Sequence, residues 1–313
     1  MYLAGGLGVF EGFYKNGKMT GKGTFTYPDG SKYMGEFLNL KINGIGVRVY
    51  LNGNRFEGEW KDGMKHGRGR MIFSKNSKYE GTWFEDRMDG EGTLVYENGD
   101  VYQGNFKNNQ MHGHGRYTYI TGTDYEGEYS QGKKWGSGKY TFRDRKQYYY
   151  GEWENNEMHG RGVRYYKDDS VYEGTFKENM RHGWGKIEFK QINLLYRGEW
   201  KNDRMHGHGS VNVENCDSFI DNTKWWKRNP LFSSKVKDVN VTFNNGIMTQ
   251  SSSIRTKRNV FRRKNVKDGT FQDTLEIDNV TSIPSVINLR SNDSAILELL
   301  SLQSGLHSAT PFE

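Results

Sequence analysis

The chain has 313 residues, of which 40 are Gly and only 4 are Pro, and its formal net charge is +7. Glycine at about twice its ordinary frequency, without a matching excess of proline, excludes a collagen-like chain and a proline-rich linker. Hydrophobic residues amount to 34% and aromatic residues to 14%, so the composition predicts a thin aromatic core rather than a thick aliphatic one.

The single cysteine, Cys216, excludes an intramolecular disulfide framework and a thiolate metal site, and it is typical of a reducing compartment. Residues 1–10 lack the basic start and the long apolar run of a signal peptide, and no stretch of about 18 apolar residues occurs. We therefore expect a soluble intracellular protein.

A unit of 23 or 24 residues organises the sequence and occurs nine times. Each unit begins with aromatic-x-Gly-x-aromatic and continues, nine residues after that Gly, with Gly-x-Gly. Another aromatic residue stands four positions past the last Gly in eight units, and Val213 replaces it in the ninth. Three Gly in each of nine units account for 27 of the 40. The units open at Phe10, Tyr33, Phe56, Tyr79, Tyr102, Tyr125, Tyr149, Tyr172 and Tyr196.

The two halves of each unit are predicted to pair as antiparallel strands joined by a tight turn. Gly, Asn or Asp occupies the turn position three residues after the second aromatic, and Leu40 is the exception. A single hairpin cannot bury its own aromatic face, so neighbouring hairpins must stack. We predict an all-β protein whose residues 10–213 form an elongated, twisted antiparallel sheet, a solenoid of about nine β-hairpins, after a cap segment at 1–9.

The even spacing of the two aromatics predicts that both rings lie on one face of a strand. The glycines are expected to leave room for large rings from neighbouring strands. Glutamates flank the first Gly in most units, with Lys and Arg interleaved, and this repetition indicates a solvated outer face rather than paired catalytic carboxylates.

The repeated Gly and aromatic positions resemble those of MORN repeats, over about two thirds of the chain. This resemblance implies a twisted antiparallel sheet with a groove, used for protein–protein contact, for dimerisation and in some members for attachment near membranes. The repeat pattern of this chain is similar to that of junctophilins, of radial-spoke and other axonemal proteins, and of cytoskeletal scaffolds of single-celled eukaryotes.

Two tryptophans interrupt the repeat at positions that are mostly polar elsewhere: Trp135 and Trp184. Each is a candidate for partner binding, and the alternative is that it fills a local gap between hairpins. Histidines recur before the second Gly without a carboxylate or thiolate at ligand spacing, and Gly-x-Gly here lacks the helix of a nucleotide-binding loop. We expect no catalytic, cofactor-binding or metal-binding residues.

The C-terminal extension, 214–313, is predicted to be largely irregular and segregated by charge, with a basic part at 224–267 and an acidic part at 268–313. Val239, Val241 and Phe243 alternate before a turn, which predicts one more strand that caps the last hairpin. A short helix is expected at 294–304. The candidate partner-binding residues here are Trp225 and Trp226, and the candidates for an anionic partner are Arg255, Lys257, Arg258, Arg262, Arg263 and Lys264.

The sequence thus favours a non-catalytic scaffold in a ciliary, axonemal or other cytoskeletal assembly. Its expected partners are other proteins of that assembly, a second copy as a homodimer, and anionic lipid or acidic protein tails at the basic segment, whereas nucleic acid is not favoured. The alternative is a peripheral membrane tether that binds anionic phospholipid through the basic tail. An enzyme is a third reading, but the residues after the repeats, 214–313, carry no cofactor motif.

Overall fold

A computed structural model describes residues 8–213 and 236–255 of the chain. The chain divides into two compact units, Met1–Tyr165 and Tyr166–Glu313, and each unit is described by itself. Apart from one 3-10 turn, the regular structure of the described residues consists of β-strands, which confirms the predicted all-β class. Among the described residues, no helix has the length and apolar character needed to cross a membrane.

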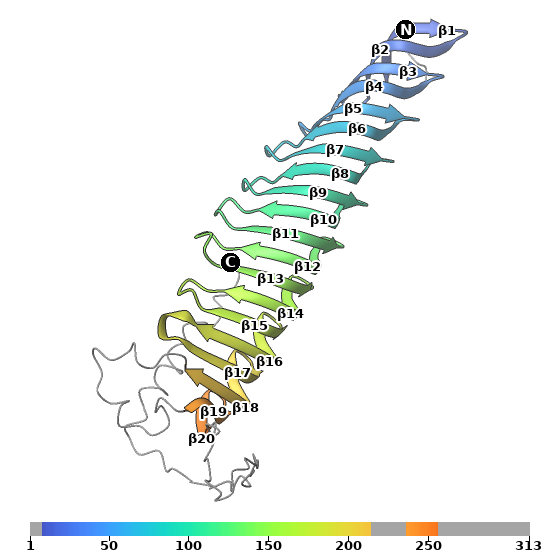
Figure 1. Ribbon diagram of the computed structural model, residues 1–313. Coiled ribbons are helices and arrows are strands. Elements are labelled where there is room, and N and C mark those ends of the chain that lie inside the picture. Colours follow the sequence, from blue (N-terminus) through green and yellow to red (C-terminus); the bar gives the residue numbers. More distant parts are fainter. Residues whose placement is uncertain (1–7, 214–235, 256–313) are drawn as a thin grey trace, which may run out of the picture. The chain divides into compact units, whose positions relative to one another are not determined.

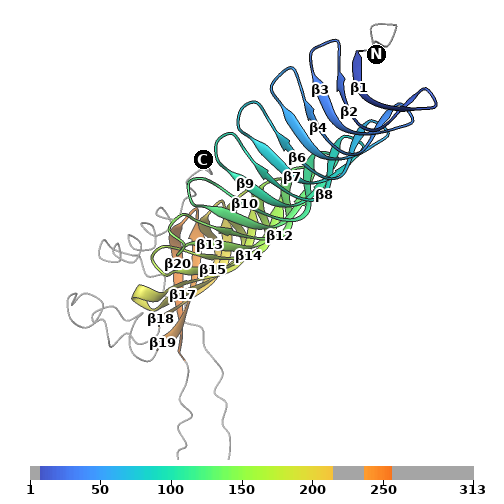
Figure 2. The same ribbon diagram turned by 90° about the horizontal axis from the view of Figure 1, so that it is seen from above.

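The first unit contains seven β-hairpins in a row (Figure 1), and each strand pairs antiparallel with the strand before and after it in the chain. Viewed from above, these hairpins are strongly curved ribbons that follow one another (Figure 2). The strands are β1 Val9–Lys15, β2 Lys18–Thr26, β3 Lys32–Leu38, β4 Lys41–Val49, β5 Arg55–Lys61, β6 Met64–Ile72, β7 Lys78–Phe84, β8 Arg87–Val95, β9 Val101–Lys107, β10 Gln110–Thr118, β11 Asp124–Ser130, β12 Lys133–Thr141, β13 Tyr148–Glu154 and β14 Glu157–Tyr165.

The second unit contains three further hairpins, again paired antiparallel in chain order. Its elements are β15 Val171–Lys177, β16 Met180–Phe189, the 3-10 turn η1 Lys190–Ile192, β17 Leu194–Lys201, β18 Arg204–Val213, β19 Val236–Asn244 and β20 Ile247–Arg255. The additional strand and turn predicted around Phe243 are confirmed, and β20 completes them as a tenth hairpin that the sequence did not reveal.

The aromatic residues form a continuous ladder on one face of the sheet, here called the ladder face. In the fifth hairpin Tyr102 is fully buried and Phe106 is 3% exposed. Their rings meet edge to face at 5.0 Å, and Tyr102 makes a second such contact, at 5.2 Å, with Tyr129 of the next hairpin. Each opening aromatic therefore joins its own hairpin to the following one, with about 0.5–1.5 kcal/mol expected per ring pair beyond area burial.

The glycines leave room for a ring, which for Gly115 comes from the neighbouring strand, as predicted, and for Gly104 comes from its own strand. Gly104 and Gly115 lie directly opposite each other, and a Cβ on Gly115 would overlap the ring and hydroxyl of Tyr102. The ring lies over this glycine pair because it starts two residues before Gly104 on the same face. The Tyr102 hydroxyl then donates to the Asn105 carbonyl at 2.9 Å.

The first Gly of every Gly-x-Gly pair has a different function, because its φ lies between 57° and 95° in all nine units. This left-handed backbone shifts the register between the two strands of the hairpin, as in a bulge that glycine permits. Glu59 and Glu128, predicted to be simply solvated, accept the backbone N–H of Arg68 at 2.9 Å and Ser137 at 3.2 Å beside the bulge. These glutamates are outer-face residues that also hold the bulge in place.

The turn within each hairpin has positive φ at both central residues, the type I′ geometry that suits a two-residue hairpin. Asn108 and Asn109 have φ of 50° and 67°. The Asn109 N–H donates to the Met88 carbonyl of the preceding hairpin at 3.0 Å, and the Asn109 side chain accepts the Met88 N–H at 2.8 Å. Leu40, the exception in the sequence, adopts the same geometry with φ of 72°.

The tenth hairpin keeps the ladder but replaces its glycines. Phe243 is 2% exposed and packs edge to face on Tyr196 at 5.5 Å, as the second aromatic of any repeat would. Val241 lies opposite Gly209, where the other repeats have Gly, and it is 4% exposed. Because Val239 stands where a large opening aromatic would be, no ring needs the space that Val241 fills.

Candidate protein-binding surface

The sheet face opposite to the ladder, here called the outer face, contains a groove of about 1430 Å³ in the first unit. It extends over β5 to β11. Backbone of the paired glycines, such as Gly81 and Gly92, forms part of its lining, so the strands themselves are accessible there. The non-glycine lining residues are Glu57, Arg68, Arg70, Lys78, Glu80, Thr82, Glu91, Thr93, Val95, Gln103, Asn105, His114, Arg116 and Glu126.

Opposite charges face each other across neighbouring strands at both ends of the groove. Arg70 lies directly opposite Glu57 on one side and Glu80 on the other. Two hairpins further along the chain, Arg116 lies opposite Gln103 and Glu126. Neighbouring strands are about 4.8 Å apart, so the groove presents a regular row of donors and acceptors. A row of several polar side chains suits a polypeptide, which carries several polar groups, better than a single anionic or cationic ligand.

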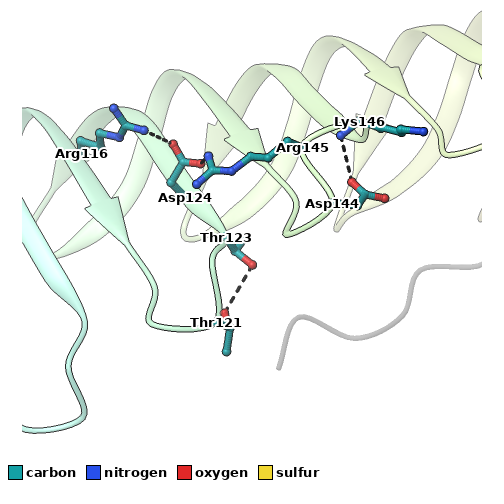
Figure 3. Close-up of polar contacts among 7 residues, drawn as sticks. All are labelled: Arg116, Thr121, Thr123, Asp124, Asp144, Arg145 and Lys146. Carbon is teal, nitrogen blue, oxygen red and sulfur yellow. Dashed lines mark hydrogen bonds and ion pairs between the residues drawn. The ribbon is translucent and has the colours of Figure 1, made fainter.

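Asp124 fixes the position of Arg116 at the rim of the groove (Figure 3). Its carboxylate is 7% exposed, with one oxygen 2.8 Å from Arg116 Nη2 and the other paired with Arg145 from the β12–β13 loop. In the same view, the Lys146 N–H donates to Asp144 at 3.1 Å, which braces that loop. Because Arg145 also pairs with this buried acid and keeps it in place, the single charge-assisted bond to Asp124 holds Arg116 more firmly than an exposed pair would.

Three cations replace apolar residues in the ladder. Lys134 is 8% exposed, and its Nζ lies 4.6 Å from the ring centre of Tyr140 and 5.1 Å from that of Trp153. Burial lowers the pKa of this lysine to about 8. Burial also lowers the pKa of Lys65, and the Asp86 carboxylate 3.7 Å away opposes that shift.

The third cation, Arg181 of the second unit, is 1% exposed. Its Nε lies 3.0 Å from Asp203 Oδ1, and its guanidinium carbon lies 4.2 Å from the ring centre of Trp200. These three cations are enclosed by aromatic rings and therefore support the core rather than offer a surface.

Both repeat-breaking tryptophans are on the surface. Trp135, on β12 of the first unit, is 43% exposed and lies opposite Glu128. Trp184, on β16 of the second unit, is 64% exposed and lies opposite Glu199. Neither side chain is enclosed, so the two residues are available to a partner.

The remaining predicted site residues belong to the C-terminal extension. Arg255 ends β20. Trp225, Trp226, Lys257, Arg258, Arg262, Arg263 and Lys264 lie outside the described residues, as does the helix expected at 294–304.

The resemblance implied a groove, but sequence reasoning did not identify its residues, and it missed the buried cations. The groove residues carry the ordinary polar pattern of an outer face, and only strand register shows which of them stand opposite one another. One of these cations, Lys134, and the buried acid Asp124 had a signal in the aligned repeat. Lys134 stands where most units have Met, and Asp124 precedes its opening aromatic where no other unit has an acid.

The stacked hairpins and the polar groove place this protein in the class of repeat scaffolds. The MORN repeat matches nine times, which together make up more than half of the chain, and the chain belongs to the MORN-repeat family. The MORN repeat of this family is a non-enzymatic scaffold repeat. The matches are at residues 10–32, 33–55, 56–78, 79–101, 102–124, 125–146, 149–171, 172–190 and 196–210.

No curated protein matches the sequence. Among solved structures, the TCP10 domain of Danio rerio CPAP in complex with a peptide of Danio rerio STIL is 11% identical, with a TM-score of 0.35 over 57% of this chain and 78% of that chain. The TCP domain of Drosophila melanogaster SAS-4, in complex with a proline-rich motif of Ana2, is 12% identical, with a TM-score of 0.31 over 48% and 80%.

Proposed function

We propose that the protein is a non-catalytic scaffold that binds an extended segment of a partner protein in the groove of its first unit. The alternating charges around Arg70 and Arg116 are the observation that carries this proposal. A polypeptide laid across the strands meets a cluster of charges around Arg70, then the uncharged Thr93 and Gln103, and then the charges of Arg116 and Glu126. Its side chains would be selected by the order of charges rather than by net charge.

Exchanging Arg70 and Glu80 tests this selection. In Arg70→Glu/Glu80→Arg the net charge is unchanged, but the order of charges in the groove is inverted. We expect at least a tenfold loss in partner recovery from pull-downs. The control exchanges an ion pair outside the groove, Lys75 and Glu97, whose charged atoms are 4.0 Å apart. Equal recovery with both double variants would refute groove binding.

We place the scaffold in a ciliary, axonemal or other cytoskeletal assembly. The support is the resemblance of its repeats to those of axonemal and cytoskeletal MORN proteins. Tagging the protein at its native locus and imaging it beside an axonemal marker tests this placement. A diffuse signal that washes out of detergent-extracted cells would contradict it.

A second candidate function is attachment to an anionic membrane through the basic segment, 224–267. Twelve Lys and Arg against one acid in this segment favour it, since each basic residue near an anionic bilayer contributes about 1 kcal/mol. Co-sedimentation of the full chain with phosphatidylinositol phosphate vesicles should weaken as salt rises. Binding that does not depend on salt concentration would count against membrane attachment. So would binding that persists after Arg262, Arg263 and Lys264 are changed to Gln.

A further inference from the structure

The second hairpin, β3 and β4, carries an apolar patch on the outer face of the first unit. Met34, Leu38 and Ile45 are 47%, 53% and 56% exposed. Val47 lies directly opposite Met34 and two residues from Ile45 on the same face. Leu40, in the connecting turn, is 48% exposed. These five residues are here called the apolar patch.

The apolar patch is a departure from the repeat and not a consequence of it. The positions equivalent to Met34 in the next two hairpins hold Glu57 and Glu80, and the position equivalent to Ile45 in the next holds Arg68. The fold therefore accepts charged residues at these sites. Single exposed apolar residues occur in other hairpins, such as Phe13 and Phe84, but a group of them gathered in one hairpin marks an interaction surface.

Lysines surround the apolar patch. Lys32 precedes Met34 on the same face, Lys22 lies opposite Glu36, and Lys41 lies opposite Leu38. Lys15 and Lys18 stand on the adjacent β1 and β2. All five are exposed, and within the described residues only Lys41 has an ion-pair partner, Asp62 at 3.2 Å.

We infer that the apolar patch binds an acidic amphipathic helix of a partner protein. Met34 and Leu38 are four residues apart on one strand, about 13 Å, which is the length of two to three helical turns. A stripe of apolar side chains at i, i+4 and i+7 fits this span. Carboxylates beside the stripe then meet the surrounding lysines.

Two other occupants fit less well. A second copy of the chain would bring the same lysines against each other. An anionic bilayer would have to receive the Glu36 carboxylate, which lies between Met34 and Leu38 on the same face, and an acid is costly to bury in lipid. A protein partner can offer Glu36 a donor.

This inference rests on the scaffold function proposed above but uses a separate surface. The probe is a fluorescent helical peptide with leucines at i, i+4 and i+7 and glutamates beside them, titrated with the full chain. We expect at least a tenfold weaker Kd for the charge-neutral variant Met34→Thr/Leu38→Thr/Ile45→Thr. A similar loss is expected for Lys22→Glu/Lys32→Glu, and a peptide with lysines in place of the glutamates should not bind.

The matched control is Gln103→Thr/His114→Thr, at positions equivalent to Met34 and Ile45 in the fifth hairpin. This control and the groove exchange Arg70→Glu/Glu80→Arg should both leave peptide affinity unchanged, which separates the two proposals. Unchanged thermal unfolding of each variant confirms its fold. Equal binding by the threonine variant overturns the inference. So does patch-dependent sedimentation with phosphatidylserine vesicles, or patch-dependent self-association by ultracentrifugation.

Discussion

At the scale of single residues, Leu40 is a residue type that does not suit the backbone conformation which the fold requires at its position. A leucine with φ of 72° is in the left-handed region, where a side chain with a Cβ costs about 1–2 kcal/mol. Its N–H still donates to the Met19 carbonyl at 3.2 Å, so the link to the preceding hairpin is kept. Leucine offers no side-chain oxygen for the Met19 N–H.

Leu40→Asn should therefore stabilise the protein by about 1 kcal/mol, because Asn tolerates this backbone and offers the missing acceptor. Urea unfolding followed by circular dichroism measures the change. The mirror variant Asn109→Leu should destabilise by a similar amount. If the asparagine variant unfolds at the same or lower urea, the positive φ at this turn is not a source of strain.

Lys134 gives a prediction about pH. Its pKa falls from 10.5 to about 8 on folding, so between these values the unfolded chain binds more protons than the folded one. Stability from this group therefore rises as pH increases from about 8 toward 10.5 and is lowest below 8. The lowered pKa corresponds to roughly 3 kcal/mol at neutral pH, and the surrounding rings return part of this by attracting the ammonium.

Lys134→Met, which restores the commonest residue of this position, should stabilise the fold by about 1–2 kcal/mol at pH 7. The gain should shrink by pH 9.5, the upper limit that avoids tyrosine ionisation. Thermal unfolding across this range measures it, with the exposed neighbour in Lys133→Met as control. A gain that is constant with pH would assign the effect to packing rather than to charge.

At the scale of the hairpin, the glycine pair and the opening aromatic depend on each other for packing. The large ring of Tyr102 is accommodated because Gly104 and Gly115 lack side chains. The tenth hairpin shows the alternative, with Val239 and Val241 on β19 and Ser251 opposite Val241 at the three corresponding positions. A large ring can be packed against two glycines, or smaller residues can fill all three positions, and both arrangements fill the same space.

Gly115→Ala should accordingly cost at least 2 kcal/mol, since the added methyl overlaps the Tyr102 ring. Adding Tyr102→Val should recover part of this loss, so the double variant will be less destabilised than the sum of the single ones. A double-mutant cycle by chemical denaturation measures the coupling. Strict additivity would mean that the ring and the glycine do not share the same space.

The hairpins themselves were predictable because period, turn residues and aromatic spacing all indicated the same structure. Three details at this scale were not. The ring over Gly104 comes from the same strand because residues two apart share a face, which the spacing of Tyr102 and Gly104 permits but does not require. The bulge at the first Gly of Gly-x-Gly, and the glutamate that caps it, depend on a register shift that sequence alone does not give.

At the scale of the whole molecule, the exposed tryptophans lead to a prediction about partners. Trp135→Ala and Trp184→Ala should each lower recovery of bound proteins in pull-downs, because large exposed aromatics contribute disproportionately to interfaces. Circular dichroism and thermal unfolding should be unchanged, since neither ring is enclosed. Trp153→Ala is the contrasting control: its ring is 2% exposed, and its loss should destabilise by about 3–5 kcal/mol. If both surface variants recover as much bound protein as the unchanged chain, these tryptophans do not bind a partner and only fill space between hairpins.

The candidate surfaces were less predictable than the fold. Trp135 and Trp184 could be found because they interrupt a pattern, and the apolar patch around Met34 could be found by the same comparison. The resemblance implied a groove, but its residues could not be identified, because Arg70 and Arg116 are separated from their opposite neighbours by turns and only strand register shows which charges meet. Asp124 has a signal in sequence, but its two arginine partners come from different strands or loops.

The contacts between hairpins also bear on how such a chain changes its length in evolution. Each hairpin of the first unit meets the next through the same ring contacts and the same turn-to-strand bond, as Tyr102 with Tyr129 and Asn109 with Met88 illustrate. Duplication or loss of one whole 23-residue segment would therefore recreate an existing junction and disturb none. A change of a few residues within a strand would break the register everywhere along that hairpin. The gene can lengthen or shorten its product in whole steps, while the loops, like the one that holds Arg145, absorb the single insertions.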